Sequence, residues 1–145
     1  MALHKIKNWC AYQERSQHET RQKLYEYGLF SNEVEQIISS LIEENFLNEE
    51  RFAYAFVSGK FNIKRWGKIK IKIELRKHKV GDYLITKALS NIDDKEYIET
   101  LKRLIEKKIK LSSENNKQKL NYKLIQYMLS RGYENDFVNE ILKQM

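Results

Sequence analysis

The sequence contains no proline and only five glycines among its 145 residues. Because the turns between strands consume glycine and proline, this scarcity favours an all-α protein. The single cysteine, Cys10, excludes an internal disulfide framework and suits a reducing cytosol. No apolar run reaches the length of a membrane-spanning helix, and residues 1–11 carry charges without the apolar stretch of a secretory signal. These absences predict a cytoplasmic protein without membrane contact.

The sequence also lacks the residue patterns of common catalytic and cofactor sites. It has neither a phosphate-binding loop nor a dinucleotide-binding turn. The three histidines and the cysteine are scattered, without the spacing of a zinc site. Two pairs of neighbouring acids, Glu49-Glu50 and Asp93-Asp94, stand at expected helix starts, where acids favour the helix dipole. We therefore predict no enzymatic activity, no cofactor and no metal.

Charge is unevenly distributed along the chain, whose formal net charge is +7. The segment Lys60–Lys79, here called the basic segment, holds nine basic residues and one acid, a net charge of +8. The segment Ser31–Glu50 holds six glutamates and no basic residue. Because like charges spaced i, i+4 on a helix repel each other, the basic segment favours an anionic partner. The overall charge alone also fits a basic soluble protein without such a partner.

Three segments of the chain resemble one another, at offsets of 51 and 53 residues. Each has a helix-like run, a break and a second short helix-like run, and the segments are Thr20–Leu41, Ile71–Leu89 and Leu124–Leu142. Each is preceded by room for a further helix. The pattern predicts three tandem three-helix repeats, spanning residues 1–46, 47–92 and 93–145.

The stretch "WGKIKIKIELRKHKV" (66–80) alternates isoleucine with lysine, which is typical of a half-buried strand. The equivalent segments of the other repeats do not alternate, so we predict a helix at 67–79. Ile71 and Leu75 then form its inner stripe. Ile69 and Ile73 lie on roughly the opposite side, where two interpretations stay open. They are buried against a neighbouring repeat, or they form an apolar strip that grips a partner.

Helix ends follow from capping residues and breaks. Ser16 or Gln17 is expected to open the second helix, with Glu19 at capping-box spacing from Ser16. Ser31 and Asn48 are the expected N-caps of the next two helices. Gly28 and Gly132 suit left-handed C-terminal caps. Lys79 stands at the matching place of the second repeat, so its cap is expected to differ. The polar stretch 111–119 is the expected long loop.

The run "FLNEERFAYAFVSGKF" (46–61) resembles the signature of the RecX family, the bacterial regulators of the RecA recombinase. The matching residues are Leu47, Glu50, Arg51, Phe52, Ala53, Phe56 and Val57. A second family element is matched by Gly67, Lys70, Ile71, Glu74, Leu75 and Val80. The first repeat resembles a further pattern through Arg15, Ser16, Glu19, Lys23, Leu24 and Gly28. Two departures are Lys79, where the family commonly has glycine, and a start almost at the first helix, without the longer N-terminal extension of some members.

The resemblance implies an elongated, curved array of three-helix repeats. It also implies a protein that binds the RecA filament on single-stranded DNA and inhibits its ATPase, strand exchange and filament growth. Such a regulator modulates DNA recombination, DNA repair and the SOS response, and is not itself an ATPase.

We place the expected binding surface on the basic segment. Its residues are Lys60, Lys64, Arg65, Trp66, Lys68, Ile69, Lys70, Lys72, Arg76 and Lys77. Aromatic residues among cations can stack on bases or anchor an interface, although ordinary packing explains Trp66 equally well. One alternative is a helical protein that binds DNA directly, without RecA. A third interpretation is an adaptor for another acidic protein.

Overall fold

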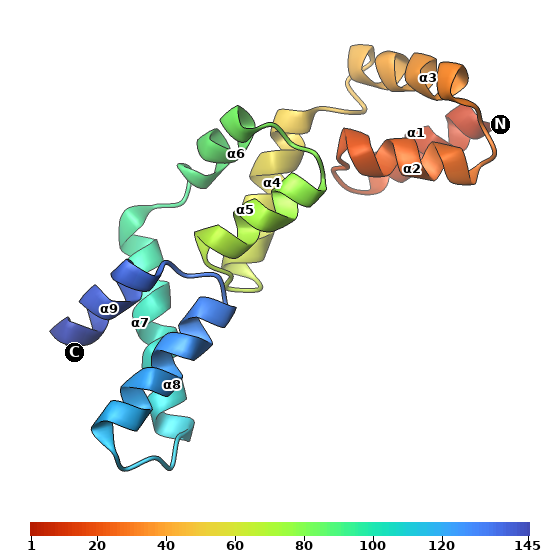
Figure 1. The fold of residues 1–145 in the computed structure, drawn as a ribbon. Coiled ribbons are helices and arrows are strands. Elements are labelled where there is room, and N and C mark those ends of the chain that lie inside the picture. The colour runs from red at the N-terminus through yellow and green to blue at the C-terminus, as the bar shows by residue number, and fades with distance from the viewer. The chain divides into compact units, whose positions relative to one another are not determined.

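The computed structural model describes residues 1–145, which form nine α-helices and no strand (Figure 1). The helices are α1 (Ala2–Tyr12), α2 (Gln17–Glu26), α3 (Ser31–Glu43), α4 (Glu49–Asn62), α5 (Lys68–Lys77), α6 (Asp82–Leu89), α7 (Asp94–Leu111), α8 (Lys117–Ser130) and α9 (Asn135–Gln144). The all-α helical repeat predicted from the sequence is confirmed. None of the helices combines the length and the apolar character needed to cross a membrane.

The alternating stretch at 66–80 is helical rather than extended. Helix α5 occupies most of it, and Ile71 and Leu75 are fully buried. A strand would place alternate residues on opposite faces, whereas residues spaced i, i+4 share one face of a helix. The helix prediction, which rested on the repeat rather than on local periodicity, is confirmed.

Equivalent positions of the three repeats have the same role in packing. The nine side chains at the three inner positions of the alignment are at most 1% exposed: Thr20, Ile71, Leu124, Leu24, Leu75, Met128, Val34, Ile85 and Val138. The fourth aligned position is looser, because Ile38 is buried but Leu89 and Leu142 are only half-buried. The register inferred from the sequence therefore matches the packing, while the boundaries 1–46, 47–92 and 93–145 stay a prediction.

The second helix of each repeat ends in the same left-handed turn. Gly28, Lys79 and Gly132 have φ angles of +85°, +62° and +94°. In each turn, the next amide donates a hydrogen bond to the carbonyl five residues earlier, in the pairs Leu29–Leu24, Val80–Leu75 and Tyr133–Met128. The expectation of a different cap at Lys79 is therefore wrong. The lysine adopts the conformation of the glycines, at a cost of about 1–2 kcal/mol.

The chain forms two compact units. The first unit comprises residues 1–56 and 74–88, and the second comprises residues 57–73 and 89–145. Helices α4 and α5 each contribute residues to both units, so each unit joins segments that are far apart in the sequence.

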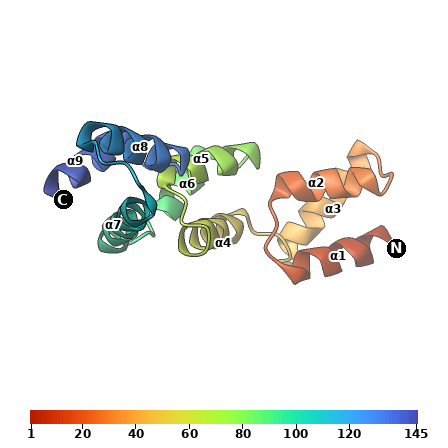
Figure 2. The ribbon, with the colours of Figure 1, turned by 90° about the horizontal axis from the view of Figure 1, so that it is seen from below.

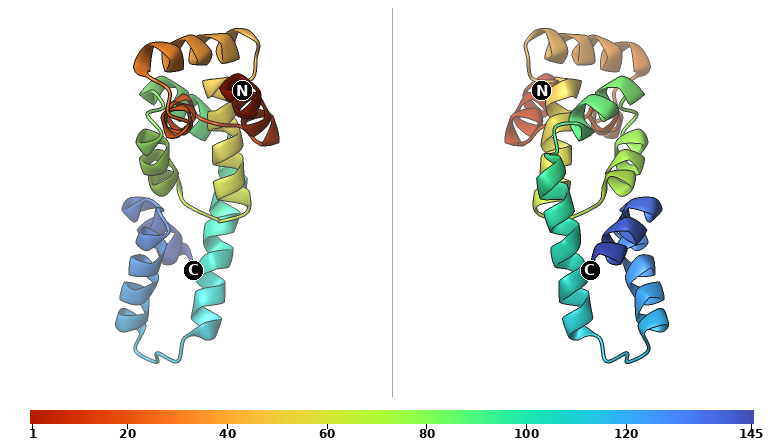
Figure 3. Two further views of the ribbon diagram at one scale, coloured as in Figure 1. Left: turned by 90° about the vertical axis from the view of Figure 1, so that its right-hand side faces the viewer. Right: turned by 90° about the vertical axis from the view of Figure 1, so that its left-hand side faces the viewer.

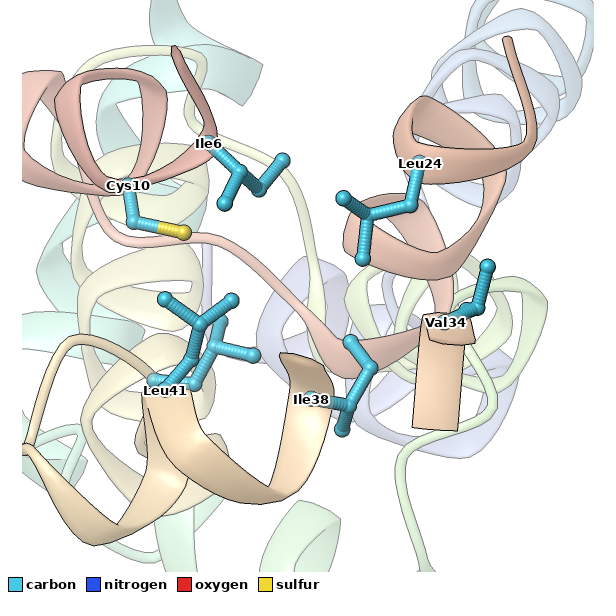
Figure 4. Close-up of a cluster of buried hydrophobic side chains, with 7 residues drawn as sticks. Ile6, Cys10, Leu24, Val34, Ile38 and Leu41 are labelled. Carbon is cyan, nitrogen blue, oxygen red and sulfur yellow. The ribbon is translucent and has the colours of Figure 1, made fainter. Parts of the chain in front are cut away.

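The first unit has a hydrophobic core among α1, α2 and α3 (Figure 4). Helix α2 packs against both α1 and α3 (Figure 2). The core side chains are Ile6, Cys10, Leu24, Val34, Ile38, Leu41 and Leu47. Burial raises the pKa of the Cys10 thiol, because the charged thiolate loses its hydration. Cys10 is thus a buried core residue.

Two of the three expected N-caps are confirmed. The Ser16 hydroxyl accepts from the Glu19 amide at 3.0 Å, and the Glu19 carboxylate accepts from the Ser16 amide at 2.8 Å. The Asn48 side chain caps α4 by accepting from the amide three residues later at 2.9 Å. Ser31 is instead the first helical residue of α3, and Phe30 occupies the N-cap position. This expectation is wrong by one residue.

Arg51, in the run that resembles the family signature, has a structural role in the first unit. Its Nε donates to both carboxylate oxygens of Glu14, at 2.9 and 3.0 Å. Its terminal nitrogens donate to the side-chain and main-chain oxygens of Asn45, each at 3.0 Å. The planar guanidinium is suited to several fixed hydrogen bonds at once. It therefore ties the turn after α3 to the segment between α1 and α2.

The second unit packs α8 against both α7 and α9 (Figure 3). Tyr97 of α7 is almost fully buried and lies among three other rings. Its ring centroid is 5.8 Å from that of Phe61, 5.2 Å from that of Tyr133 and 5.6 Å from that of Phe137. These aromatic contacts bring the end of α4 and the start of α9 to the same side of α7.

Candidate basic interaction surface

The structure divides the predicted binding residues between the two units. Eight of them lie in the second unit, on the end of α4, the loop after it and the first part of α5: Lys60, Lys64, Arg65, Trp66, Lys68, Ile69, Lys70 and Lys72. Arg76 and Lys77 lie in the first unit, on the last turn of α5. We describe the eight residues of the second unit as the candidate surface.

The start of α5 is held by the turn between α8 and α9. The Gly67 amide donates to the Arg131 carbonyl at 2.8 Å, and the Ile69 amide donates to the Gly132 carbonyl at 2.9 Å. This approach requires glycine on both sides. A Cβ on Gly67 would lie 2.3 Å from the Gly132 carbonyl oxygen, and a Cβ on Gly132 would lie 2.3 Å from the Cβ of Lys70.

The Lys68 amide, which lies between those of Gly67 and Ile69, is bonded by a buried tyrosine. The Lys68 amide donates to the Tyr97 hydroxyl at 3.0 Å, and that hydroxyl donates to a Glu134 carboxylate oxygen at 2.5 Å. Burial, and then the bond to Glu134, raise the pKa of Tyr97. The amides at the start of α5 therefore already have partners in the protein. An anion that binds here must be recognised by side chains rather than by the helix N-terminus.

The loop before α5 has a fixed backbone and free side chains. The Arg131 guanidinium donates to the Lys64 carbonyl, and the Tyr133 hydroxyl donates to the Arg65 carbonyl at 3.0 Å. Burial raises the pKa of Tyr133 to about 12. Arg65 has a φ of +58°, and the side chains of Lys64 and Arg65 are exposed. The loop therefore presents two cations from a well-anchored main chain.

Trp66 lies among the cations of this surface. The half-buried indole has the Lys60 ammonium 4.8 Å and the Lys70 ammonium 4.5 Å from its ring centroid. The Lys68 ammonium lies 4.6 Å from the centroid of the Tyr97 ring. Such contacts are attractive, because the face of an aromatic ring carries negative charge. They orient three lysines and relieve part of the repulsion expected from the basic segment.

Ile69 and Ile73 are exposed on the outer face of α5. These residues are 44% and 48% exposed, whereas Ile71 and Leu75 on the inner face are fully buried. The interpretation that Ile69 and Ile73 are buried against a neighbouring repeat does not fit this exposure. The exposure favours the alternative, an apolar strip on a basic helix.

The cations differ in how far their charges are compensated. In the first unit, Arg76 pairs with Asp82 at 3.3 Å and Lys77 pairs with Glu74 at 3.1 Å. In the second unit, no carboxylate lies within ion-pair distance of Lys64, Arg65 or Lys72. Lys64 and Arg65 precede the two exposed isoleucines in the sequence, and Lys72 lies between them.

A serine–histidine pair in the first unit is part of the packing. The Ser16 hydroxyl lies 3.0 Å from Nδ1 of His78, whose ring packs against Phe52 and Phe56. Ser16 is fully buried, and its hydroxyl also caps α2. A nucleophile must reach its substrate, so this pair connects elements rather than forming a reactive site. No group of three or more His, Cys, Asp or Glu side chains is placed to hold a metal ion.

The residues that anchor the surface were not predicted from the sequence. Tyr97, Arg131, Tyr133 and Glu134 had no assigned role, and Gly132 was noted only as a helix cap. The bonds of Tyr97, Arg131 and Tyr133 to the α5 region join residues 29 to 68 positions apart, and Glu134 acts through Tyr97. The only signal in the sequence was the pair of glycines at 67 and 132, at the start of one helix and the end of another.

The chain matches two models of three-helix domains. The RecX second three-helix domain matches residues 48–89, which contain α4 to α6, and the RecX third three-helix domain matches residues 94–142. Together the matches cover more than half of the chain. The chain belongs to the RecX family.

Curated RecX proteins and a solved RecX structure resemble the chain along most of its length. "Regulatory protein RecX" of Clostridium perfringens is 33% identical over 133 residues, and that of Clostridium acetobutylicum is 30% identical over 135 residues. Each alignment covers 90% of this chain but 62% of the relative, so the chain spans about three-fifths of these proteins. The crystal structure of RecX from Lactobacillus salivarius superposes with a TM-score of 0.89 at 25% identity, covering 99% of this chain and 93% of that one.

The two RecX domain matches include both sides of the anchoring contact described above. Gly67 and α5 lie in the second domain, and Arg131 to Glu134 lie in the third. In this RecX chain, the third domain therefore holds the start of the basic helix of the second.

Proposed function

We propose that the protein binds the RecA filament on single-stranded DNA and inhibits its ATPase, strand exchange and filament growth. Membership of the RecX family supports a regulatory role, because the curated relatives are named regulatory proteins. The structural observation that carries the proposal is the outer face of α5, where two isoleucines are exposed beside uncompensated cations.

A surface of this kind suits a partner that offers both anionic and apolar groups. A partner that covers the exposed isoleucines stabilises the complex, because their apolar surface is removed from water. The surrounding cations attract acidic side chains or DNA phosphates and fix the orientation of the complex. The filament offers both, because it combines a protein surface with a nucleic acid. The anchored backbone of Lys64 to Ile69 presents these groups with little ordering left to occur on binding.

The cations differ in what they can contribute. Lys64, Arg65 and Lys72 have no carboxylate partner and are assigned the main contacts. Arg76 and Lys77 would first have to leave Asp82 and Glu74, so we assign them smaller effects.

The test is the ATPase activity of RecA on single-stranded DNA, titrated with substoichiometric amounts of this protein. We expect the wild-type protein to lower the ATPase rate. The triple variant Lys64→Glu, Arg65→Glu, Lys72→Glu should need about tenfold more protein for the same inhibition, because interfacial cations of this kind contribute more than 1 kcal/mol.

The matched control reverses three exposed lysines elsewhere, Lys5→Glu, Lys87→Glu and Lys143→Glu, so that net charge changes equally. We expect the control to inhibit like the wild type. Equal inhibition by the two triple variants would contradict the assignment to the basic segment.

Direct binding to nucleic acid, without RecA, is the second candidate, favoured by the net charge of +8 on the basic segment. A recognition helix reads a major groove with its N-terminal residues, but the first turn of α5 is bonded to the turn after α8. Contact with the phosphate backbone fits better. A steep salt dependence of binding to bare DNA, with no effect on RecA, would favour this candidate. No effect in either assay would point to an adaptor for another acidic protein.

A further inference from the structure

A second group of cations lies outside the basic segment, at the end of the helical hairpin formed by α7 and α8. Residues 107–123, here called the hairpin end, hold six lysines and one acid, a net charge of +5. The lysines are Lys107, Lys108, Lys110, Lys117, Lys119 and Lys123, and the acid is Glu114.

The loop of the hairpin end is built by local hydrogen bonds. The Glu114 amide donates to the Ser112 hydroxyl at 3.1 Å, and the Glu114 carboxylate accepts from the Asn116 amide at 3.1 Å. The Asn116 side chain caps α8 by accepting from the Lys119 amide at 3.1 Å. Figure 3 shows this loop at the end of the α7–α8 pair that lies away from the turn between α8 and α9.

Four of the six lysines have neither a carboxylate nor an aromatic partner. Lys123 pairs with Glu114 at 3.3 Å, and Lys108 lies 4.6 Å from the centroid of the Tyr127 ring. A backbone bond and Lys123 lower the pKa of Glu114, so this carboxylate is already satisfied. The uncompensated and exposed lysines are Lys107, Lys110, Lys117 and Lys119.

Large apolar side chains are exposed beside these charges. Tyr122 of α8 is 66% exposed and lies between Lys119 and Lys123 in the sequence, and Leu111 at the end of α7 is 76% exposed. Exposed tyrosines next to lysines are typical of surfaces that bind single-stranded nucleic acid, where the ring stacks on a base and the cations contact phosphates.

We propose that the hairpin end contacts the phosphate backbone of single-stranded nucleic acid, with Tyr122 as a stacking face. Both candidate functions above place the contact on the basic segment, whereas this surface lies outside it, so the proposal goes beyond them.

The spacing and type of the cations favour a nucleic acid over an acidic protein. Tyr97, which contacts the basic segment, and Lys110 are 13 residues apart on α7, or about 20 Å along the helix. A linear polyanion can reach both groups of cations. The hairpin end also contains lysine without arginine, and lysine suits phosphates as a point charge, whereas arginine forms the fork that matches a carboxylate.

The test measures binding of the full chain to a fluorescently labelled oligothymidylate by anisotropy over a range of salt concentrations, without RecA. The variant Lys107→Gln, Lys110→Gln, Lys119→Gln removes three uncompensated charges. Its plot of log affinity against log salt should be less steep by about 2, since each phosphate contact on a single strand contributes about 0.7. If the two proteins bind equally at 1 M salt, where the phosphate contacts contribute little, its affinity at 0.1 M salt should be about a hundredfold lower. Tyr122→Ala should weaken binding at least about fivefold and leave the slope unchanged.

The matched control is Lys5→Gln, Lys23→Gln, Lys87→Gln, all in the first unit, which lowers net charge equally and should keep the wild-type slope. Equal slopes for the two triple variants would overturn the proposal. In that case the cleft of about 470 Å³ beside the hairpin end, whose lining includes Leu120, Ile125 and Lys117, would suit an acidic peptide instead. The hairpin variant is also titrated into the RecA ATPase assay, so that failure of either proposal is visible without the other.

Discussion

Helices α2 and α5 occupy equivalent places in two repeats, yet they present different outer surfaces. Their inner faces are equally buried, with Thr20 and Leu24 in α2 and Ile71 and Leu75 in α5. At the outer positions, α2 has His18 and Gln22, and α5 has Ile69 and Ile73. The inner faces hold the shared fold, and the outer faces are free to differ. The outer face of α5 is therefore a better place to seek function than any buried position.

The two helices also begin differently. Helix α2 has a local capping box, the reciprocal bonds of Ser16 and Glu19, and one long-range bond, from the Gln17 amide to the Glu49 carboxylate at 3.0 Å. The amides at the start of α5 are bonded by residues of the third repeat, Arg131, Gly132 and Tyr97. The start of α2 thus combines a local capping box with a long-range bond, whereas the three bonds described at the start of α5 are all long-range.

The largest expected effect on stability comes from truncating a side chain on the buried face of α5 rather than on its exposed face. Leu75→Ala should lower the free energy of unfolding by about 3 kcal/mol, because it leaves a cavity at a fully buried position. Ile73→Ala, on the exposed face, should change it by less than about 0.5 kcal/mol. Urea denaturation followed by circular dichroism measures both. Equal losses would mean that Ile73 is covered in solution.

A smaller effect on stability tests the close approach of Gly67, at the start of α5, to Gly132. Gly67→Ala should lower the free energy of unfolding by about 2 kcal/mol, since its Cβ would meet the Gly132 carbonyl oxygen. The control is Gly59→Ala within α4, where a Cβ meets no atom within 4 Å. This change should raise stability by up to about 1 kcal/mol through helix propensity. If Gly67→Ala behaved like its control, the close approach to Gly132 would not exist in solution.

The smallest effect concerns the shared left-handed turn. Lys79→Gly should raise the free energy of unfolding by about 0.5–1 kcal/mol, because relief of the left-handed strain outweighs the greater entropy of the unfolded chain. Gly28→Ala, at the equivalent place after α2, should lower it by about 1 kcal/mol. Thermal unfolding of both variants gives the comparison. A destabilised Lys79→Gly protein would show that the lysine side chain makes a compensating contact.

The fold was largely predictable because the sequence repeats itself. Where the local pattern of one repeat was misleading, the equivalent segments of the other two indicated the correct structure. The isoleucine–lysine alternation at 66–80 favoured a strand, and only the equivalent segments indicated a helix. The residues of the candidate surface were predictable from the sequence, but the hydrogen bonds that hold their backbone in place were not. Hydrogen bonds such as Lys68 to Tyr97 leave no periodic trace in the sequence, since they join residues that meet only after packing.

The sequence by itself determined the all-α class, the register of the buried positions and the concentration of cations at 60–79. Hydrophobic periodicity and composition are properties of each segment itself, so they can be read without knowing what the helix packs against. Tertiary structure alone decided that Ile69 and Ile73 are exposed, that Lys60 and Lys70 lie near the Trp66 ring, and that Lys79 adopts a left-handed conformation. The physical reason is that periodicity identifies the face of a helix that is buried, whereas only packing decides what lies against the opposite face.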